Sequence, residues 1–270
     1  MSRVTLPPAA ADILTHLPPP RPSRLPVKDG LVDWDSAESI SIPDMARSLA
    51  FIRANGELPV SLSSSSPRTR RTDHGCRVPL RGHGLYSSLA NPSQPDLDSY
   101  QDKNSVGQCP VPDATIEAIK AEVQAWLQPG QPGARVLQSG LRVCLLDGFL
   151  LYTPPMETVM SHLDLKLFLL VSRARATQRR EARDGYVTLE GFWTDPPGYV
   201  DKIVWPNYAE SHAWLFENGD VEASLKEEVL AAQGIQAQVG KGLDVDFPTT
   251  LQWAVQSVMR DLAQFVDKSS

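Results

Sequence analysis

Three short apolar runs in the second half of the chain constrain its fold more than any other feature. They span residues 141–146, 165–171 and 235–239, and each is rich in aliphatic side chains. Runs of this length suit strands better than helices, and short apolar strands that alternate with helices are typical of a parallel sheet. The sequence therefore predicts an α/β fold with a mostly parallel sheet.

Helices are expected where apolar residues recur at intervals of three or four positions between start and stop signals. Pro43 suits the first turn of one helix, and Asn55-Gly56 suits its end because glycine readily adopts the left-handed backbone that closes a helix. Further helices are expected at about residues 112–127, 174–183 and 249–266.

Two stretches lack the apolar periodicity of a folded segment. Residues 1–24 are rich in proline, which favours irregular, extended backbone. Residues 61–108 contain consecutive serines and a basic run at 68–71, with few large aliphatic side chains. Such a segment cannot bury enough apolar area to offset its ordering entropy, so we expect a disordered insert. The folded domain is expected to comprise residues 25–60 and 109–268.

Composition and charge narrow the class of protein. The chain has 270 residues, of which 41% are hydrophobic, enough for one core. Its 26 basic and 32 acidic residues give a net charge of −6, which disfavours a nucleic-acid-coating protein. No apolar run is long enough to span a bilayer, no secretory signal is visible, and the few cysteines favour a reducing compartment. We expect a cytoplasmic protein without membrane or nucleic-acid partners, although the basic run is also compatible with a nuclear signal.

Asp147 directly follows the first of the three apolar runs. Because ligands of open α/β sheets gather at the carboxyl ends of strands, this acid is a candidate to hold a metal ion or to orient a nucleophile. The alternative is that Asp147-Gly148 only forms a turn.

Arginines are concentrated on the helix that follows the second apolar run. Arg179 and Arg183 lie one helical turn apart on the same face, and Arg180 is adjacent to the first of them. Guanidinium groups at this spacing can bind a polyphosphate, and phosphoryl transfer needs such charge. A solvated helix face balanced by Glu181 and Asp184 is the alternative.

An aromatic residue beside a carboxylate, Trp34-Asp35, precedes the first expected helix, and Tyr186 follows the arginine-rich helix. Such side chains can stack on a planar base and hydrogen-bond a sugar diol. The alternative is that Trp34 anchors the core and Asp35 caps a helix.

Four potential zinc ligands occur near one another, at His74, Cys76, His83 and Cys109. Their spacings match no paired Cys/His template, and they lie in the low-complexity stretch or directly beside it. We therefore expect no zinc site there.

Four segments carry a resemblance to a known family. They are Leu-Pro-Val-Lys-Asp-Gly-Leu-Val-Asp-Trp-Asp at 25–35, Leu-Leu-Asp-Gly-Phe-Leu-Leu-Tyr at 145–152, the arginine-rich helix, and Asp-Pro-Pro-Gly-Tyr-Val-Asp-Lys-Ile-Val-Trp-Pro-Asn-Tyr at 195–208. Together they resemble the nicotinamide riboside kinases, which belong to the P-loop nucleoside kinases. The resemblance covers about residues 24–60 and 106–266, and its most specific piece is the last segment. It implies a three-layer P-loop fold and ATP- and Mg²⁺-dependent phosphorylation of the riboside 5′-hydroxyl to nicotinamide mononucleotide in NAD biosynthesis.

The resemblance implies how the nucleoside is bound. Trp34 and Tyr186 take the positions of two aromatic rings that sandwich the nicotinamide ring. Asp35 takes the position of a carboxylate that binds the ribose hydroxyls, and Arg180 that of an arginine that contacts substrate.

The resemblance also implies groups for phosphoryl transfer. Arg179 and Arg183 take the positions of lid arginines that contact ATP and act in catalysis. Asp147 takes the position of an acid associated with Mg²⁺, where many relatives have glutamate.

The chain departs from the family pattern in its phosphate loop. No G-x-x-x-x-G-K-[ST] motif occurs in the printed sequence, so the amide cradle, its lysine and the hydroxyl ligand of Mg²⁺ are not found, nor is the family's catalytic base. We expect a sheet that is incomplete at its first strand and little phosphoryl transfer. A gene model with a wrong start and a retained non-coding stretch would explain this departure and the insert at 61–108.

Two other functions remain open. A kinase for another nucleoside, of the uridine type, would also use a pocket for a flat base. A non-catalytic remnant or interaction module would retain only the substrate half of the site. Binding of a panel of nucleosides distinguishes the first alternative from a nicotinamide riboside kinase. Separate titrations with ATP and with riboside distinguish the second alternative from a kinase.

Overall fold

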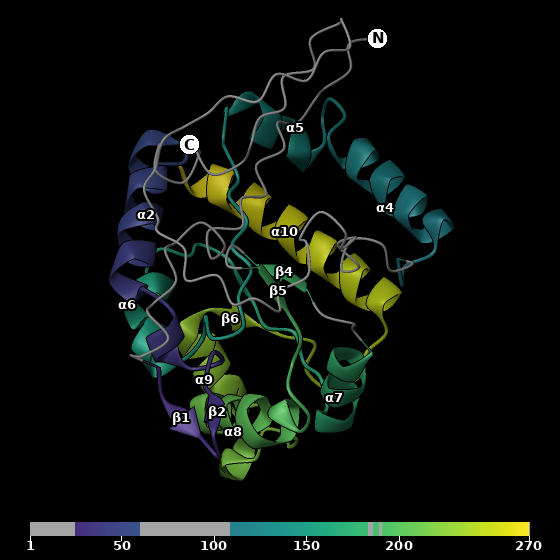
Figure 1. Ribbon diagram of the computed structural model, residues 1–270. Coiled ribbons are helices and arrows are strands. Elements are labelled where there is room, and N and C mark those ends of the chain that lie inside the picture. The colour runs from purple at the N-terminus through teal and green to yellow at the C-terminus, as the bar shows by residue number, and fades with distance from the viewer. Residues whose placement is uncertain (1–24, 60–108, 183–185, 189–190, 270) are drawn as a thin grey trace, which may run out of the picture.

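The computed structural model shows a long C-terminal helix that crosses a largely helical molecule with small sheets (Figure 1). The structure describes residues 25–59, 109–182, 186–188 and 191–269, so the predictions for residues 1–24 and 61–108 lie outside the described residues. The α-helices are α2 (Ile42–Asn55), α4 (Asp113–Trp126), α5 (Pro132–Gln138), α6 (Glu157–Met160), α7 (Arg173–Glu181), α8 (Trp205–His212), α9 (Glu227–Gln233) and α10 (Phe247–Ser269). The strands are β1 (Val27–Lys28), β2 (Leu31–Val32), β3 (Lys166–Leu167), β4 (Tyr186–Thr188), β5 (Gly191–Trp193) and β6 (Ile235–Gln236). Short helical turns are η2 (Ala37–Ser39), η4 (Pro154–Met156), η5 (Val200–Val204), η6 (Ala213–Leu215) and η7 (Glu217–Gly219).

The predicted helices are present at the expected places. Helix α2 has proline in its first turn and ends at Gly56, whose φ of 66° lets its N–H reach the Ile52 carbonyl at 2.7 Å. Helices α4 and α10 confirm the other two amphipathic predictions, and α10 packs against α4 and α5. Helix α7 confirms the arginine-rich prediction as far as Glu181. None of the helices in the described ranges is long and apolar enough to cross a membrane.

The sheets differ from the prediction of one mostly parallel sheet. Strands β3 and β6 form a parallel pair, Lys166 with Ile235 and Leu167 with Gln236, which confirms that the second and third apolar runs contribute parallel strands. The β1–β2 and β4–β5 pairs are antiparallel, and the described strands form three separate two-stranded sheets. Each of these described strands is only two or three residues long.

The first apolar run does not form the buried strand that its sequence predicts. In residues 141–146, Leu141, Val143 and Leu145 are 37%, 43% and 57% exposed, and the run has no continuous strand ladder. Leu169, beyond the end of β3, is also 57% exposed. A parallel strand is buried only when neighbours pair with its edges and helices cover its faces. Leu141, Val143 and Leu145 therefore remain in contact with solvent, whereas Leu146 packs against the core.

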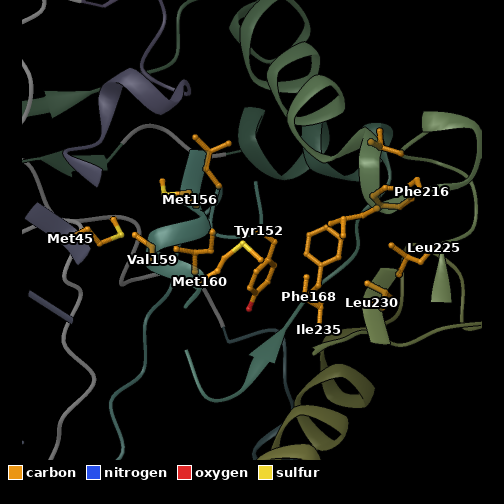
Figure 2. Packing of buried hydrophobic residues seen from close by; sticks show 14 of the residues in the cluster. Met45, Tyr152, Met156, Val159, Met160, Phe168, Phe216, Leu225, Leu230 and Ile235 are labelled. Carbon is orange, nitrogen blue, oxygen red and sulfur yellow. The ribbon is translucent and has the colours of Figure 1, made fainter. Parts of the chain in front are cut away.

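The hydrophobic core lies between α2, α6, β3 and the segments that follow α8 (Figure 2). Phe168 is at its centre: its ring stacks on His212 at 5.6 Å and meets Tyr152 and Phe216 edge to face at 5.9 and 6.2 Å. The Tyr152 hydroxyl donates to the Leu167 carbonyl at 3.1 Å, so the polar end of this buried ring is satisfied. The core therefore fixes the end of β3 against the C-terminal end of α8.

A π-helical turn leads directly into α8. Turn η5 begins after Tyr199 and passes without a break into α8, whose second residue is Pro206. Proline has no N–H to donate to the carbonyl four residues earlier and its ring crowds that carbonyl, so a wider turn accommodates it. Tyr199 and Asn207 are thereby held on one continuous helical segment.

Candidate functional site

A tight hairpin presents the predicted Trp34-Asp35 pair. Strands β1 and β2 are joined by Asp29 and Gly30, whose φ values of 51° and 77° are typical of a two-residue hairpin turn. The Asp33 N–H donates to the Pro26 carbonyl at 2.8 Å and extends the pairing by one step. The chain then leaves the hairpin at Trp34 and enters η2.

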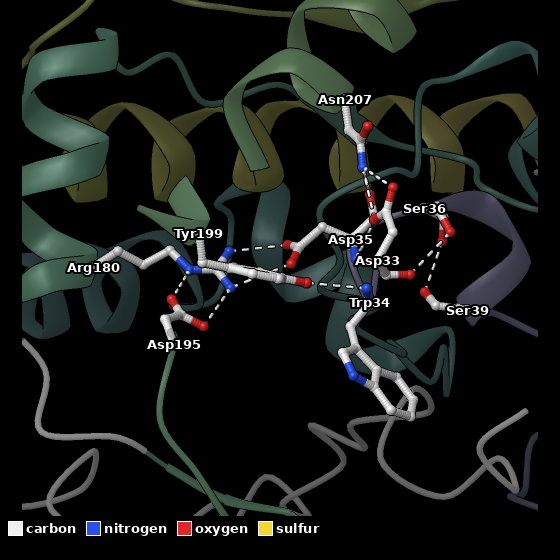
Figure 3. Close-up of polar contacts among 9 residues, drawn as sticks. All are labelled: Asp33, Trp34, Asp35, Ser36, Ser39, Arg180, Asp195, Tyr199 and Asn207. Atoms are coloured by element: carbon white, nitrogen blue, oxygen red, sulfur yellow. Dashed lines mark hydrogen bonds and ion pairs between the residues drawn. The ribbon is translucent and has the colours of Figure 1, made fainter. Parts of the chain in front are cut away.

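Arg180, on α7, connects Asp35 with Asp195 (Figure 3). Its Nη1 and Nη2 donate to the two carboxylate oxygens of Asp35 at 2.9 and 3.3 Å. Its Nε and Nη2 donate to the carboxylate of Asp195 at 2.8 and 3.3 Å. The side chains are mostly buried, with 21% of Arg180, 12% of Asp35 and 16% of Asp195 exposed. One guanidinium therefore holds two acids that are remote in sequence, with the paired geometry that arginine and carboxylates favour.

Asp195 and Tyr199 are placed by a turn after β5. The Tyr199 N–H donates to the Pro196 carbonyl at 2.9 Å, and Gly198 has a φ of 76° that favours glycine. The turn lets the chain reverse from β5 into η5, so Asp195 and the Tyr199 ring both face Arg180. The guanidinium carbon lies 5.9 Å from the centroid of that ring.

Burial and ion pairing shift the pKa values of this cluster in the directions expected. Burial disfavours the charged Arg180, but its hydrogen bonds to Asp195 and Asp35 outweigh that effect and raise its pKa. Burial and the nearby Asp35 carboxylate raise the pKa of Tyr199 far above that of a free phenol. Tyr199 is therefore a neutral phenol at physiological pH, and its hydroxyl oxygen accepts the Trp34 N–H at 3.0 Å.

The structure brings some predicted site residues together. Asp35 and Arg180 are in direct contact, and Trp34 adjoins them with its indole pointing away from the ion pair (Figure 3). Tyr186 begins β4, where its backbone pairs with Trp193, but its side chain lies outside what the structure describes. Arg183 also lies outside the described residues, so the proposed ring sandwich and the Arg183 role stay predictions.

Arg179 and Asp147 are not part of this cluster. The guanidinium of Arg179 lies over the Phe247 ring, 4.3 Å from its centroid, at the start of α10. Asp147 is exposed in the segment after the first apolar run, and within the described part of the chain it makes no hydrogen bond or ion pair. The neighbouring residues 179 and 180 therefore point to different parts of the molecule.

The residues that the structure describes contain no group of three or more acidic, histidine or cysteine side chains that could hold a metal ion by themselves. Magnesium bound to nucleotide phosphates retains several waters and needs only one or two protein carboxylates. The exposed Asp147 carboxylate meets that requirement, and its assignment to Mg²⁺ stays a prediction.

Sequence reasoning assigned no role to Asp33, Asp195, Tyr199 and Asn207, which complete the cluster. Asp33 and Asn207 are 0% and 6% exposed, and the Asn207 amide donates to both Asp33 oxygens at 2.8 Å. The signal was available, because all four residues lie within two of the segments that carry the family resemblance. No periodicity in the sequence shows that these segments meet.

Comparison with known proteins identifies relatives by sequence. The chain is 29% identical over 240 residues to a nicotinamide riboside kinase of Schizosaccharomyces pombe, which covers 89% of this chain and 80% of that protein. It is 46% identical over 83 residues to that of Eremothecium gossypii and 32% over 118 residues to that of Saccharomyces cerevisiae. These two matches span 34% and 47% of the respective relatives.

Neither a family model nor a solved structure matches the chain. Three of the four segments that carry the resemblance contribute Asp35, Arg180, Asp195 and Tyr199 to one cluster. The chain is therefore similar in sequence to nicotinamide riboside kinases, and to the Schizosaccharomyces pombe protein over most of its length.

Proposed function

We propose that this protein binds nicotinamide riboside at the cluster around Asp35 and is of the type that phosphorylates the riboside 5′-hydroxyl with ATP, a step of NAD biosynthesis. The observation that carries the proposal is the mostly buried Asp35 carboxylate, held by Arg180 next to the Trp34 indole. The choice of riboside follows from the similarity to nicotinamide riboside kinases.

The hydrogen-bonding capacity of Asp35 supports binding of a sugar diol. An ionised carboxylate has about four acceptor sites, and Arg180 occupies one on each oxygen. The Tyr199 hydroxyl also hydrogen-bonds this carboxylate, so a remaining lone pair can accept one hydroxyl of the diol, and displacement of Tyr199 would free a position for the second. The arginine neutralises and orients the carboxylate, so little rearrangement of the carboxylate itself is needed when the diol binds.

The adjacent indole supports recognition of a flat, cationic base. Trp34 is half-buried, and its ring diverges from Asp35 on the same short loop. A pyridinium ring stacked on indole gains both apolar contact and attraction between its charge and the π face. Tyr186 is proposed as the second ring of this site.

The phosphate side of the site is assigned to fewer residues. We assign Arg179 and Arg183 to ATP, and Asp147 to Mg²⁺, which supplies charge neutralisation of the phosphates when it is bound. In this structure Arg179 packs over Phe247, so it would have to leave that ring to reach a nucleotide. Because no G-x-x-x-x-G-K-[ST] motif occurs in the printed sequence, we propose that the 270-residue chain transfers phosphate poorly.

The absence of a G-x-x-x-x-G-K-[ST] motif from the printed sequence also favours a second candidate function, a nucleoside-binding module without catalysis. That reading retains Asp35, Arg180 and Trp34 in their roles but assigns no turnover to the chain. A uridine-type substrate would use the same residues, except that a neutral base gains less from stacking on Trp34.

Calorimetric titration of the purified chain with nicotinamide riboside, uridine and ATP, each alone, tests these proposals. We expect the riboside to bind more tightly than uridine, and Asp35→Asn to weaken riboside binding by about 1–3 kcal/mol. Glu38→Gln is the matched control, because Glu38 is an exposed acid in the adjoining turn η2. Equal binding of riboside by the parent and the Asp35→Asn variant contradicts the proposed site. Tighter binding of uridine favours the alternative substrate.

A further inference from the structure

Asp33 is a buried acid that does not contact Arg180 but borders the proposed riboside site. Its side chain is fully buried. Besides the Asn207 amide, its carboxylate accepts the Asp35 N–H at 3.1 Å, and the Lys28 ammonium lies 3.3 Å from its Oδ2. A buried carboxylate needs several such partners to offset the loss of hydration. All of these partners come from the hairpin that presents Trp34 or from α8.

Asn207 links the hairpin to α8 through both ends of its amide. Its Oδ1 accepts a hydrogen bond from Lys28 Nζ at 2.6 Å, and its Nδ2 donates to the Asp35 carbonyl at 3.1 Å as well as to Asp33. The orientation of the amide follows from these partners, because an ammonium can only donate and a carboxylate can only accept. Asn207 thus cannot rotate without losing several hydrogen bonds together.

The backbone of Trp34-Asp35 is held at three polar groups. The Trp34 N–H donates to the Tyr199 hydroxyl, the Asp35 N–H to Asp33, and the Asp35 carbonyl accepts from Asn207. Tyr199, directly before η5, and Asn207, on α8, thus fix this peptide relative to those two elements, and Asp33 fixes it relative to the hairpin. The indole of Trp34 and the carboxylate of Asp35 both extend from this fixed backbone (Figure 3).

We propose that Asp33, Lys28 and Asn207 are positioning residues that hold Trp34 and Asp35 in the geometry required for nucleoside binding. The proposal rests on the proposed function, because it takes Trp34 and Asp35 as the residues that touch the riboside. None of the three needs to contact the ligand. Their effect is to reduce the conformational freedom of Trp34 and Asp35, which do contact it. A displacement of about 1 Å in such groups can change binding or catalysis by about 100-fold.

Exchanging the hydrogen-bonding roles of Asp33 and Asn207 distinguishes positioning from a general structural role. In Asp33→Asn or Asn207→Asp alone, two amides or two carboxylates face each other, and the pair loses its match of donor and acceptor. In the double variant Asp33→Asn/Asn207→Asp, the amide at 33 can donate to the carboxylate at 207, which still faces Lys28. The double variant restores the charge of the site but not the donor to the Asp35 carbonyl.

Riboside titration of these variants is the first test. We expect each single variant to weaken riboside binding by about 10- to 100-fold at a temperature where urea unfolding shows it to be folded, and the double variant to regain part of the loss. Glu38→Gln should bind as the parent does. Single variants that are folded and bind the riboside like the parent overturn the proposal.

Hydrogen exchange separates failure of this proposal from failure of the proposed function. If the parent does not bind the riboside, the proposed function is wrong, but the backbone restraint can still be measured. Slow exchange of the Trp34 and Asp35 N–H groups in the parent, and faster exchange in Asn207→Ala with the amides of α10 unchanged, supports the restraint. Exchange at Trp34 and Asp35 that is fast in the parent, or unaltered in the variant, overturns it.

Discussion

The two halves of the proposed site differ in how completely their residues are engaged. On the nucleoside side, Asp35, Arg180 and Asp195 are mostly buried and hydrogen-bonded to one another. On the phosphate side, Asp147 is exposed, and Leu141, Val143 and Leu145 of the apolar run before it are in contact with solvent. The segments that carry Asp35, Arg180 and Asp195 therefore suffice to form a polar cluster. A parallel strand, in contrast, needs a neighbouring strand to satisfy the backbone hydrogen bonds along its edge.

The two sides also depend on different kinds of interaction. Four charge-assisted hydrogen bonds define the positions of the groups around Arg180, and each is local to a few atoms. A phosphate site in a P-loop protein instead uses backbone amides that a strand and a helix present together. The following experiments test this contrast, beginning with the largest expected effect.

Phosphoryl transfer by the 270-residue chain is the strongest test. The loss of one preorganised donor typically weakens transition-state stabilisation by about 3–4 kcal/mol, and the phosphate-loop motif supplies several. We therefore expect no riboside-dependent ATP turnover above background. The measurement is nicotinamide mononucleotide formation by protein purified free of host kinases. Turnover comparable with that of a relative carrying the motif would show that the phosphate side is complete.

Replacement of Arg180 tests how strongly the nucleoside side is held together. In Arg180→Met, the mostly buried Asp35 and Asp195 carboxylates lose their shared cation, so we expect the free energy of unfolding to fall by about 3–5 kcal/mol. Arg179→Met is the matched control, since it removes a contact with Phe247 worth about 0.5–1 kcal/mol. Urea unfolding measures both. Similar losses in the two variants would contradict the central role of Arg180.

Two leucines near the phosphate side sharpen the contrast within one segment. Leu150 is 3% exposed and belongs to the core, so Leu150→Ala should lower the free energy of unfolding by about 2–5 kcal/mol. Leu145 is 57% exposed, and Leu145→Ala should change it by less than about 0.5 kcal/mol. Urea unfolding again provides the measurement. A large loss in Leu145→Ala would show that another segment or molecule covers the first apolar run.

His212 provides a test of the core that is independent of both halves of the site. Burial lowers its pKa, although its Nδ1–H donates to the Tyr208 carbonyl at 3.0 Å. The unfolded state therefore binds this proton at a higher pH than the folded state, so stability should fall as the pH decreases below about 6.5. One such group changes stability by at most about 1.4 kcal/mol per pH unit.

Unfolding of His212→Phe at pH 7.5 and 5.5 isolates this contribution. Phenylalanine can retain the stack on Phe168, whose ring lies 5.6 Å from that of His212, but it cannot be protonated. We expect the difference in unfolding free energy between the two pH values to be smaller in the variant than in the parent. An identical difference would mean that His212 is not the titrating group.

The sequence by itself determined the helices of this protein. Their signals are local: proline in the first turn of α2, Gly56 at its end, and the apolar stripe of α10 lie within the segments that they define. The sequence also placed Asp35 and Arg180 among the candidate residues, through short motifs rather than through any periodicity.

Only the tertiary structure decided which segments meet. Asp35 and Arg180 are 145 residues apart, and no pattern in either segment specifies the other, nor does any pattern specify the pairing of Asp33 with Asn207. The first apolar run is a case where a local pattern was insufficient. Its composition predicts a buried strand, but burial of a strand depends on neighbours along both of its edges. Helical hydrogen bonds form within a segment, whereas strand pairing and buried ion pairs require a second segment at the right distance, and that information is distributed over the whole fold.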